Sequence, residues 1–269
     1  MPAPVKGLLP IRALVEYDGA GYQGFQVLSG KPSIQGTLEQ VLQRLTGRST
    51  RIRYAGRTDA GVHALGQVIA ADVQWRHSLA DLERAWNALL PADIAVRDLA
   101  LVTDASFHPR FSASSRLYRY TVWTAPWRSP LQARYAHHQP RQPDVARMNQ
   151  AAALLAGRHD FASFGQPTHG DSTVRVVYRA GWQSAGWTLH FEIEANAFLR
   201  RMVRTIVGTL LEVGQGRRSV ASVSQMLAAP DRALAAPPAP ACGLCLVEVK
   251  YERDASAALS MTDVTFVSP

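Results

Sequence analysis

The chain has 269 residues, 47% of them hydrophobic, which is enough apolar material for one large domain or two closely packed ones. It has no run of about 18 uncharged apolar residues, no secretion-type apolar stretch after Met1 and only two cysteines, so we expect a cytoplasmic protein and neither a membrane protein nor a disulfide-stabilised secreted scaffold. The net charge of +8 and the isoelectric point of about 9.9 favour a polyanionic partner.

The first half of the chain shows strand and helix patterns in the order β-α-β-β-α-β. Thr37 and Gln40 form a capping-box pattern ahead of apolar residues at helical spacing, which predicts that the first helix begins there. Ser78 and Asp81 begin a second helix, which ends before Pro91. Alternating and apolar runs predict strands at residues 11–17, 51–54, 67–73 and 94–102.

The second half of the chain repeats this order. Asp144 caps a helix that runs to Leu155, and a long helix begins at Asn196. Strands are predicted at residues 117–123, 174–182, 187–194 and 244–251. We therefore expect an α+β fold of two tandem ferredoxin-like halves, residues 1–108 and 109–269, whose antiparallel sheets flank a basic central cleft.

The basic residues of the chain are almost all arginine. Only Lys6, Lys31 and Lys250 are lysines, so the other 26 of the 29 basic residues are arginines. A guanidinium group binds phosphate through two hydrogen bonds and stacks on bases, which favours a nucleic-acid partner. The alternative is that this bias, together with the many alanines, reflects a G·C-rich genome.

A glycine-punctuated loop between two predicted strands carries the strongest chemical signal. Residues 56–66 contain glycines at positions 56, 61 and 66, which allow a close approach of the backbone to a ligand. Asp59 is the only carboxylate in this run, and Arg57 precedes it by two residues. An ionised carboxylate held there could act as a nucleophile or a base. The alternative is a structural loop in which Asp59 caps a turn and pairs with Arg57.

Residues 56–64, Gly-Arg-Thr-Asp-Ala-Gly-Val-His-Ala, resemble the signature of the tRNA pseudouridine synthase A family. The resemblance continues in order along nearly the whole chain, with Phe25 where the family often has tryptophan. The other stretches that resemble family motifs are residues 17–19, 22–26, 107–111, 116–120, 157–161 and 196–204.

The resemblance implies a role for several side chains. Asp59 matches the essential catalytic aspartate, and Arg204 matches the arginine that pairs with it. Tyr118 matches the tyrosine that stacks on the target base, although an ordinary strand aromatic is the alternative for this position. Arg57 matches an arginine that helps to admit the flipped nucleotide. Leu246, or alternatively Leu244, would pack beneath the base.

The resemblance also implies the reaction and its partners. The expected activity is isomerisation of uridine to pseudouridine at positions 38 to 40 of the tRNA anticodon stem-loop, without a cofactor, by a homodimer. The alternative function is a non-catalytic RNA-binding protein on the same fold. A hydrolase that uses Asp59 with His63 lacks an oxyanion or metal partner in the sequence, and the half zinc pattern of Cys242 and Cys245 has no second pair, so we expect no metal.

The helix predicted from Asn196 has a basic face opposite its apolar stripe. Three arginines of its first turns, Arg204 among them, oppose the helix dipole at an N-terminus, so we expect a phosphate or carboxylate to compensate them. A solvated basic face is the alternative. The residues expected to bind RNA are Arg200, Arg201, Arg217 and Arg218.

Overall fold

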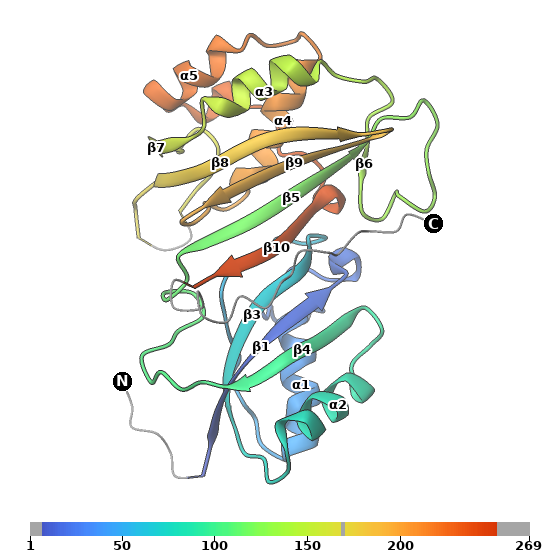
Figure 1. Ribbon diagram of the computed structural model, residues 1–269, viewed down its shortest axis with the longest axis vertical. Helices are drawn as coiled ribbons and strands as arrows, with labels where there is room; N and C mark the ends of the chain where they lie inside the picture. Colours follow the sequence, from blue (N-terminus) through green and yellow to red (C-terminus); the bar gives the residue numbers. More distant parts are fainter. Residues whose placement is uncertain (1–6, 168–169, 252–269) are drawn as a thin grey trace.

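The computed structural model describes residues 7–167 and 170–251, and within them one continuous sheet runs through the whole molecule (Figure 1). Its main path has the strand order β4-β1-β3-β10-β5-β9-β8-β7, with β2 beside β3 and β6 beside β5. The strands are β1 (Leu9–Tyr17), β2 (Arg53–Tyr54), β3 (His63–Val73), β4 (Ile94–Leu101), β5 (Ser115–Trp123), β6 (His137–His138), β7 (Gly157–Asp160), β8 (Val174–Ala185), β9 (Thr188–Ala195) and β10 (Leu244–Lys250).

Five α-helices pack in two groups, one on each half of the sheet. The helices are α1 (Ile34–Thr46), α2 (Leu79–Leu89), α3 (Val145–Ala153), α4 (Met202–Gly214) and α5 (Ala221–Ala228) in the described residues. Figure 1 shows α1 and α2 beside β1, β3 and β4, and α3, α4 and α5 beyond the other end of the sheet. None of these helices is long and apolar enough to cross a membrane. This arrangement confirms the predicted α+β fold.

The two antiparallel sheets expected for the two halves meet edge to edge. They join where β3 pairs with β10 in parallel, with His63 opposite Cys245 and Ala64 opposite Leu246. The other pairs along the main path are antiparallel. Because β3 follows directly after residues 56–62, this junction brings β10, the last strand of the described residues, against the loop that carries Asp59.

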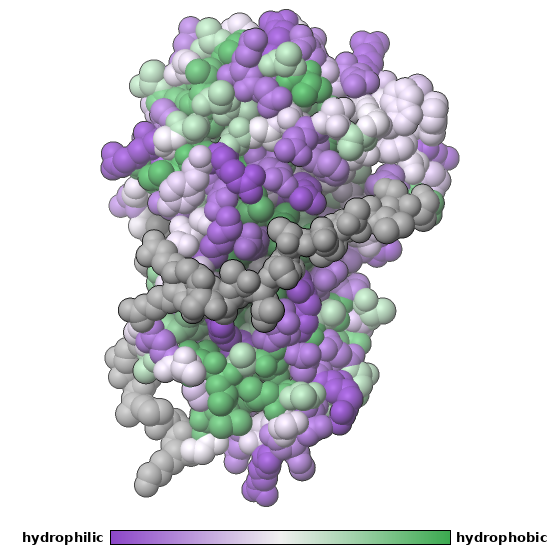
Figure 2. Space-filling model, in the orientation of Figure 1, coloured by the Kyte–Doolittle hydropathy of each residue, from purple (hydrophilic) through white to green (hydrophobic). Residues whose placement is uncertain are grey.

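Strand alternation divides the second half into a core face and a polar face. On β9, Leu189, Phe191, Ile193 and Ala195 are fully buried. The intervening Glu192 and Glu194 instead form ion pairs with arginines of the neighbouring strands. In Figure 2 the visible face is mostly hydrophilic over β5, β8 and β9, whereas hydrophobic side chains gather over β1, β3 and β4. The two-residue period of a strand produces the division of β9 into a core face and a polar face.

The first helix begins three residues earlier than Thr37, the start that the capping-box pattern predicts. Ser33 is the N-cap of α1, and its hydroxyl accepts a hydrogen bond from the Gly36 amide at 3.3 Å. The Thr37 hydroxyl instead donates to the Ser33 carbonyl at 3.1 Å. The cap predicted at Ser78 for α2 is confirmed, since its hydroxyl accepts from the Asp81 amide. The N-cap of α1 is therefore Ser33, four residues before the predicted Thr37.

The helix predicted from Asn196 begins only at Met202. The Asn196 side chain accepts hydrogen bonds from the amides of Val176 and Ala197, which holds the chain in a loop. Arg201 then takes a left-handed conformation with a φ of +63°, which no residue inside an α-helix can adopt. Arg200 and Arg201 therefore precede α4, and the prediction that they lie on its polar face is wrong.

Candidate functional site

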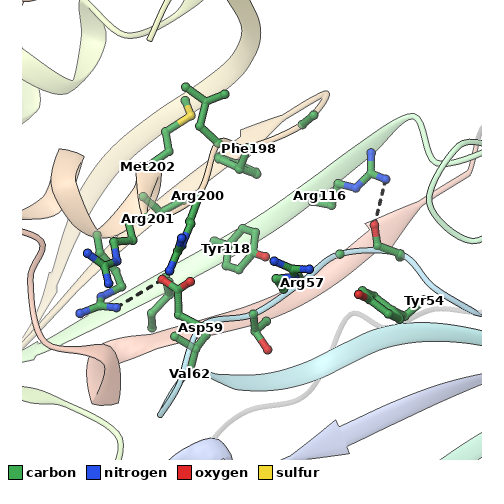
Figure 3. Close-up of a pocket in the computed structure, with 18 of the residues that line it drawn as sticks. Tyr54, Arg57, Asp59, Val62, Arg116, Tyr118, Phe198, Arg200, Arg201 and Met202 are labelled. Atoms are coloured by element: carbon green, nitrogen blue, oxygen red, sulfur yellow. Dashed lines mark hydrogen bonds and ion pairs between the residues drawn. The ribbon is translucent and has the colours of Figure 1, made fainter. Parts of the chain in front are cut away.

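A pocket opens where the loop that carries Asp59 meets β5, β10 and the segment before α4 (Figure 3). Among the described residues that line it, Asp59 is the only one with a carboxylate, and six are arginines. The lining residues are Tyr54, Ala55, Gly56, Arg57, Thr58, Asp59, Val62, Arg110, Arg116, Tyr118, Ala197, Phe198, Leu199, Arg200, Arg201, Met202, Val203, Arg204 and Leu244. The pocket therefore combines one acid with a strongly positive wall, which suits a polyanionic ligand.

Asp59 and Arg204 face each other across the pocket. Nη1 of Arg204 donates to Oδ2 of Asp59 at 3.3 Å, and both side chains are mostly buried. Nε of Arg204 donates to the Ala239 carbonyl at 2.7 Å, and the Ala239 amide donates back to the Arg204 carbonyl at 2.9 Å. Arg204 is thus fixed from both ends, while the second carboxylate oxygen of Asp59 has no hydrogen-bond partner among the described residues. That oxygen is available to a substrate.

Buried polar contacts hold the Asp59 loop in shape. Gln67, fully buried on β3, accepts from the Gly56 amide at 3.2 Å and donates to the Gly56 carbonyl at 2.6 Å. The buried hydroxyl of Thr58 is hydrogen-bonded to the Tyr17 hydroxyl at 2.8 Å. The main-chain positions on both sides of Arg57 are therefore fixed before any ligand binds, as a preorganised site requires.

The motif at residues 17–26 supports this loop from behind. The Phe25 amide donates to the Thr58 carbonyl at 3.2 Å, and the Gly61 amide donates to the Tyr22 carbonyl at 3.3 Å. Gly24 has a φ of +99°, and a Cβ built there would lie 2.7 Å from the Thr58 carbonyl oxygen. No side chain fits between the two segments. The sequence resemblance pointed to this motif without indicating what it does.

Tyr118 projects from β5 into the pocket, close to Arg57 in Figure 3. Its ring meets Phe198 edge to face, with centroids 5.0 Å apart. Its hydroxyl has no hydrogen-bond partner among the described residues. Burial raises the pKa of this phenol; Arg116 opposes the shift and Asp59 adds to it, so the hydroxyl stays protonated at neutral pH.

The aliphatic residue of β10 at the pocket is Leu244. It lines the pocket, whereas Leu246 is fully buried opposite Tyr118 in the strand register and is not among the lining residues. Of the two leucines that the sequence left open, Leu244 is the one that lines the pocket.

Arg116 is a pocket residue to which the sequence analysis assigned no role. It is buried, and its guanidinium donates to the carbonyls of Asn196 at 2.7 Å, Ala55 at 3.2 Å and Ala113 at 3.3 Å, as well as to that of Arg110. All of these acceptors are neutral, and burial lowers the pKa of the guanidinium. Its position two residues before Tyr118, on the same face of β5, is the sequence signal that could have identified it.

Arg217 and Arg218 lie away from the pocket. They follow the C-terminal end of α4, whose 13 residues extend about 20 Å from the end that carries Arg204. Arg218 pairs with Glu212 at 2.9 Å, which offsets its charge. Arg200 and Arg201 do line the pocket, but from a loop. Arg201 is the N-cap residue of α4, so these two cations still lie at the positive end of its dipole, as the sequence analysis expected for the start of this helix.

His63 is buried beneath the loop and does not line the pocket. Its Nδ1 lies 3.1 Å from Oδ1 of Asp18 and accepts a hydrogen bond from the Gly19 amide at 3.2 Å, so both partners come from the segment upstream in the chain. Burial lowers the pKa of the imidazole, and Asp18 opposes this shift. The geometry removes the support for a hydrolase that pairs Asp59 with His63. Among the described residues, no group of three His, Cys, Asp or Glu side chains could hold a metal.

The family model described as tRNA pseudouridine synthase matches residues 13–112 and 151–252. The chain is 46% identical over 246 residues to tRNA pseudouridine synthase A of Geobacillus kaustophilus (strain HTA426), covering 91% of this chain and 95% of that protein. It is 42% identical over 242 residues to the protein of the same name from Syntrophotalea carbinolica (strain DSM 2380 / NBRC 103641 / GraBd1), covering 90% and 96%.

A solved archaeal box H/ACA sRNP Nop10–Cbf5 complex aligns at a TM-score of 0.30 and 11% identity over 75% of this chain and 43% of that chain, which is too little to compare sites. The sequence similarity to the two synthases is much stronger, since it covers about nine tenths of this chain at more than 40% identity. The family model spans every lining residue of the pocket except Arg116 and Tyr118, and the chain belongs to the tRNA pseudouridine synthase family.

Proposed function

We propose that this protein isomerises uridine to pseudouridine in tRNA, with Asp59 as the catalytic residue. The observation that carries the proposal is the single carboxylate among the described residues that line the pocket, which Arg204 holds through one oxygen while the other has no hydrogen-bond partner among them. Six arginines line the same pocket, as a phosphate-bearing substrate requires. The names of the relatives support tRNA as the substrate.

The reaction is balanced without any redox partner. The N1–C1′ bond of uridine breaks, the uracil rotates, and C5 forms a new bond to C1′; C5 then loses its proton and N1 gains one. An ionised Asp59 serves each of the routes that this chemistry allows, namely attack on the ribose, attack on the base, or removal of a ribose proton. The Arg204 guanidinium lies 3.3 Å from this carboxylate and positions it for each of the three routes.

The other pocket residues act on the base and its backbone. A uridine in a stem must leave the stack before Asp59 can reach it. Tyr118 and Leu244 then offer an aromatic and an aliphatic surface on which the extruded uracil packs. Arg57 is exposed at the rim, where it meets the nucleotide as it enters, and Arg200 and Arg201 bind phosphates beside it.

Four finer statements complete the proposal. The target positions are 38 to 40 of the anticodon stem-loop, the active species is a cytoplasmic homodimer, and neither a cofactor nor a metal takes part. The chain divides into ferredoxin-like halves at residues 1–108 and 109–269, which would place Asp59 and Arg204 in different halves. Family resemblance supports the first two statements, and the repeated strand order supports the last.

The test is tritium release from tRNA labelled at C5 of uracil, with the modified positions mapped on the product. The protein should release tritium and form pseudouridine in equal amounts. Asp59→Asn should bind tRNA within about tenfold of the original affinity, about 1.4 kcal/mol, and release none. A protein that binds tRNA without releasing tritium is an RNA-binding module, and clear turnover by well-folded Asp59→Asn would overturn the role of Asp59.

A further inference from the structure

We propose that Phe111 is a stacking platform for a nucleobase that neighbours the target uridine in the RNA. This inference rests on the proposed function and adds a substrate contact outside the reaction pocket. It concerns the short loop at residues 108–112, which lies between β4 and β5. Arg110, the residue before Phe111, lines the pocket.

Phe111 is a large apolar side chain that the fold leaves in water. Its exposed fraction is 73%, against complete burial for core aromatics such as Phe25. Burial of an aromatic ring stabilises a fold, and this ring contributes little of that stabilisation while it stays in water. The Arg110 guanidinium carbon lies 5.6 Å from the ring centroid, and the His108 ring centroid lies 4.5 Å away.

The exposed ring is held by an ordered loop. Nδ1 of His108 accepts from the amides of Arg110 at 3.1 Å and Phe111 at 3.4 Å. The Ser112 amide donates to the His108 carbonyl at 2.9 Å, and the His108 amide donates to the Ser112 hydroxyl at 2.9 Å. The loop is thus folded without a ligand, and a preorganised ring loses little entropy when a base stacks on it.

The same loop is tied to the reaction pocket. Arg116 donates both to the Arg110 carbonyl and to the Ala55 carbonyl, next to Gly56 at the start of the Asp59 loop. The Tyr251 hydroxyl donates to the Pro109 carbonyl at 2.7 Å, which anchors the loop to the end of β10. The position of Phe111 relative to Asp59 is therefore set by the fold.

A nucleobase is the ligand that fits this pairing of an aromatic ring with a guanidinium. Bases splayed out of a helix stack on aromatic rings and on arginine planes. Extrusion of the target uridine exposes a face of the adjacent base, and Phe111, which follows the pocket residue Arg110, can cover it. The six pocket arginines attract the phosphates on both sides of that base.

The test measures tRNA affinity in an Asp59→Asn background, so that turnover does not interfere. Phe111→Ala should weaken binding by about 5- to 150-fold, the range for stacking of one base on an aromatic ring. Phe111→Trp should bind within about threefold of the parent, and Phe111→Leu should lose most of what Phe111→Ala loses. Thermal stability should not change, because the ring is exposed.

The matched control is Trp127→Ala. Trp127 is 58% exposed, and it follows the end of β5 opposite to Arg116, about 30 Å away along nine residues. Its removal should leave tRNA affinity unchanged. An equal loss with Trp127→Ala would mean a general effect of exposed aromatics and would refute the platform.

A cycle with modified RNA identifies the stacked base. Full-length tRNAs that each carry one abasic nucleotide within two positions of the target uridine are compared on Phe111 and Phe111→Ala. At one position the abasic tRNA should bind weakly to the Phe111 protein and lose nothing further in Phe111→Ala. Additive losses of affinity at every abasic position would overturn the inference, and so would full tRNA affinity in Phe111→Ala or Phe111→Leu. In either case tritium release by the original protein would still uphold the proposed function. Absence of tritium release overturns the proposed function, whatever Phe111 does to binding.

Discussion

Replacing Gly24 by alanine should damage catalysis from outside the pocket. Gly24 is not a lining residue, but its backbone lies directly behind the Asp59 loop. An alanine Cβ would lie 2.7 Å from the Thr58 carbonyl oxygen and 3.2 Å from the Asp59 carbonyl carbon, whereas ordinary contacts begin at 3.4 Å. The contacting atoms are main chain, so the Asp59 loop itself must move.

The size of the effect follows from that shortfall of about 0.7 Å. A misplacement of about 1 Å at a catalytic group costs about 100-fold in rate, so kcat should fall by roughly 10- to 100-fold. The φ of +99° adds backbone strain of about 1–2 kcal/mol for any residue with a Cβ. In a protein of this size that strain lowers Tm by roughly 2–8 °C.

The assay is single-turnover tritium release from C5-labelled tRNA with saturating protein, together with tRNA binding and thermal unfolding. Gly21→Ala is the matched control in the same segment, since its φ lies outside the left-handed region and no heavy atom would lie within 4 Å of its Cβ. It should keep the original rate. If folded Gly24→Ala also kept the original single-turnover rate, the claim that this segment positions Asp59 would be refuted.

Three further outcomes follow from the site. Tyr118→Ala should lose far more turnover than Tyr118→Phe in tritium release, because Phe keeps the ring against Phe198; equal losses would shift the role to the hydroxyl. Replacing Arg200 and Arg201 with glutamine should make the plot of log tRNA-binding constant against log salt less steep by about 1.4–1.8, and an unchanged slope would mean that neither binds a phosphate. Burial opposes ionisation of Asp18, but the Ala20 amide and the charges of His63 and Arg134 outweigh it and lower the pKa of the carboxyl, so its stabilising effect is present above the usual pKa of 3.8 and is lost as pH falls through the lowered value. Chemical denaturation should therefore show a gap between the original protein and Asp18→Asn at pH 6 that narrows below about pH 4, and a constant gap would contradict this.

The sequence by itself determined the elements and the family. Apolar alternation along residues 11–17 and 117–123 identified strands, because every second side chain of a half-buried strand faces the core and is apolar. The Ser78 cap was predictable for the same reason, since a cap depends on residues three positions apart. The nine-residue run at 56–64 carried the resemblance on which the expected role of Asp59 rests.

Local rules failed where a distant contact outweighed them. The stretch after Asn196 is helical by pattern, but the Asn196 side chain bonds to Val176 and the segment bridges to Gln166, so α4 starts at Met202. The Asn196 side chain thus competes with the helix for backbone groups. The error at α1 is local by contrast, because Ser33, four residues before Thr37, caps the helix there.

Only the tertiary structure decided how the site is assembled. Asp59 and Arg204 are 145 positions apart in the chain, and no local pattern predicts their contact. The pairing of β3 with β10 brings the two parts of the chain together. Leu244 and Leu246 lie on the same face of β10, so alternation along the strand does not distinguish them. Their places along the sheet, which the pairing of β10 with its distant partners sets, bring Leu244 to the pocket and leave Leu246 buried opposite Tyr118. Arg116, whose carbonyl acceptors come from three separate segments, gains its place only when those segments meet.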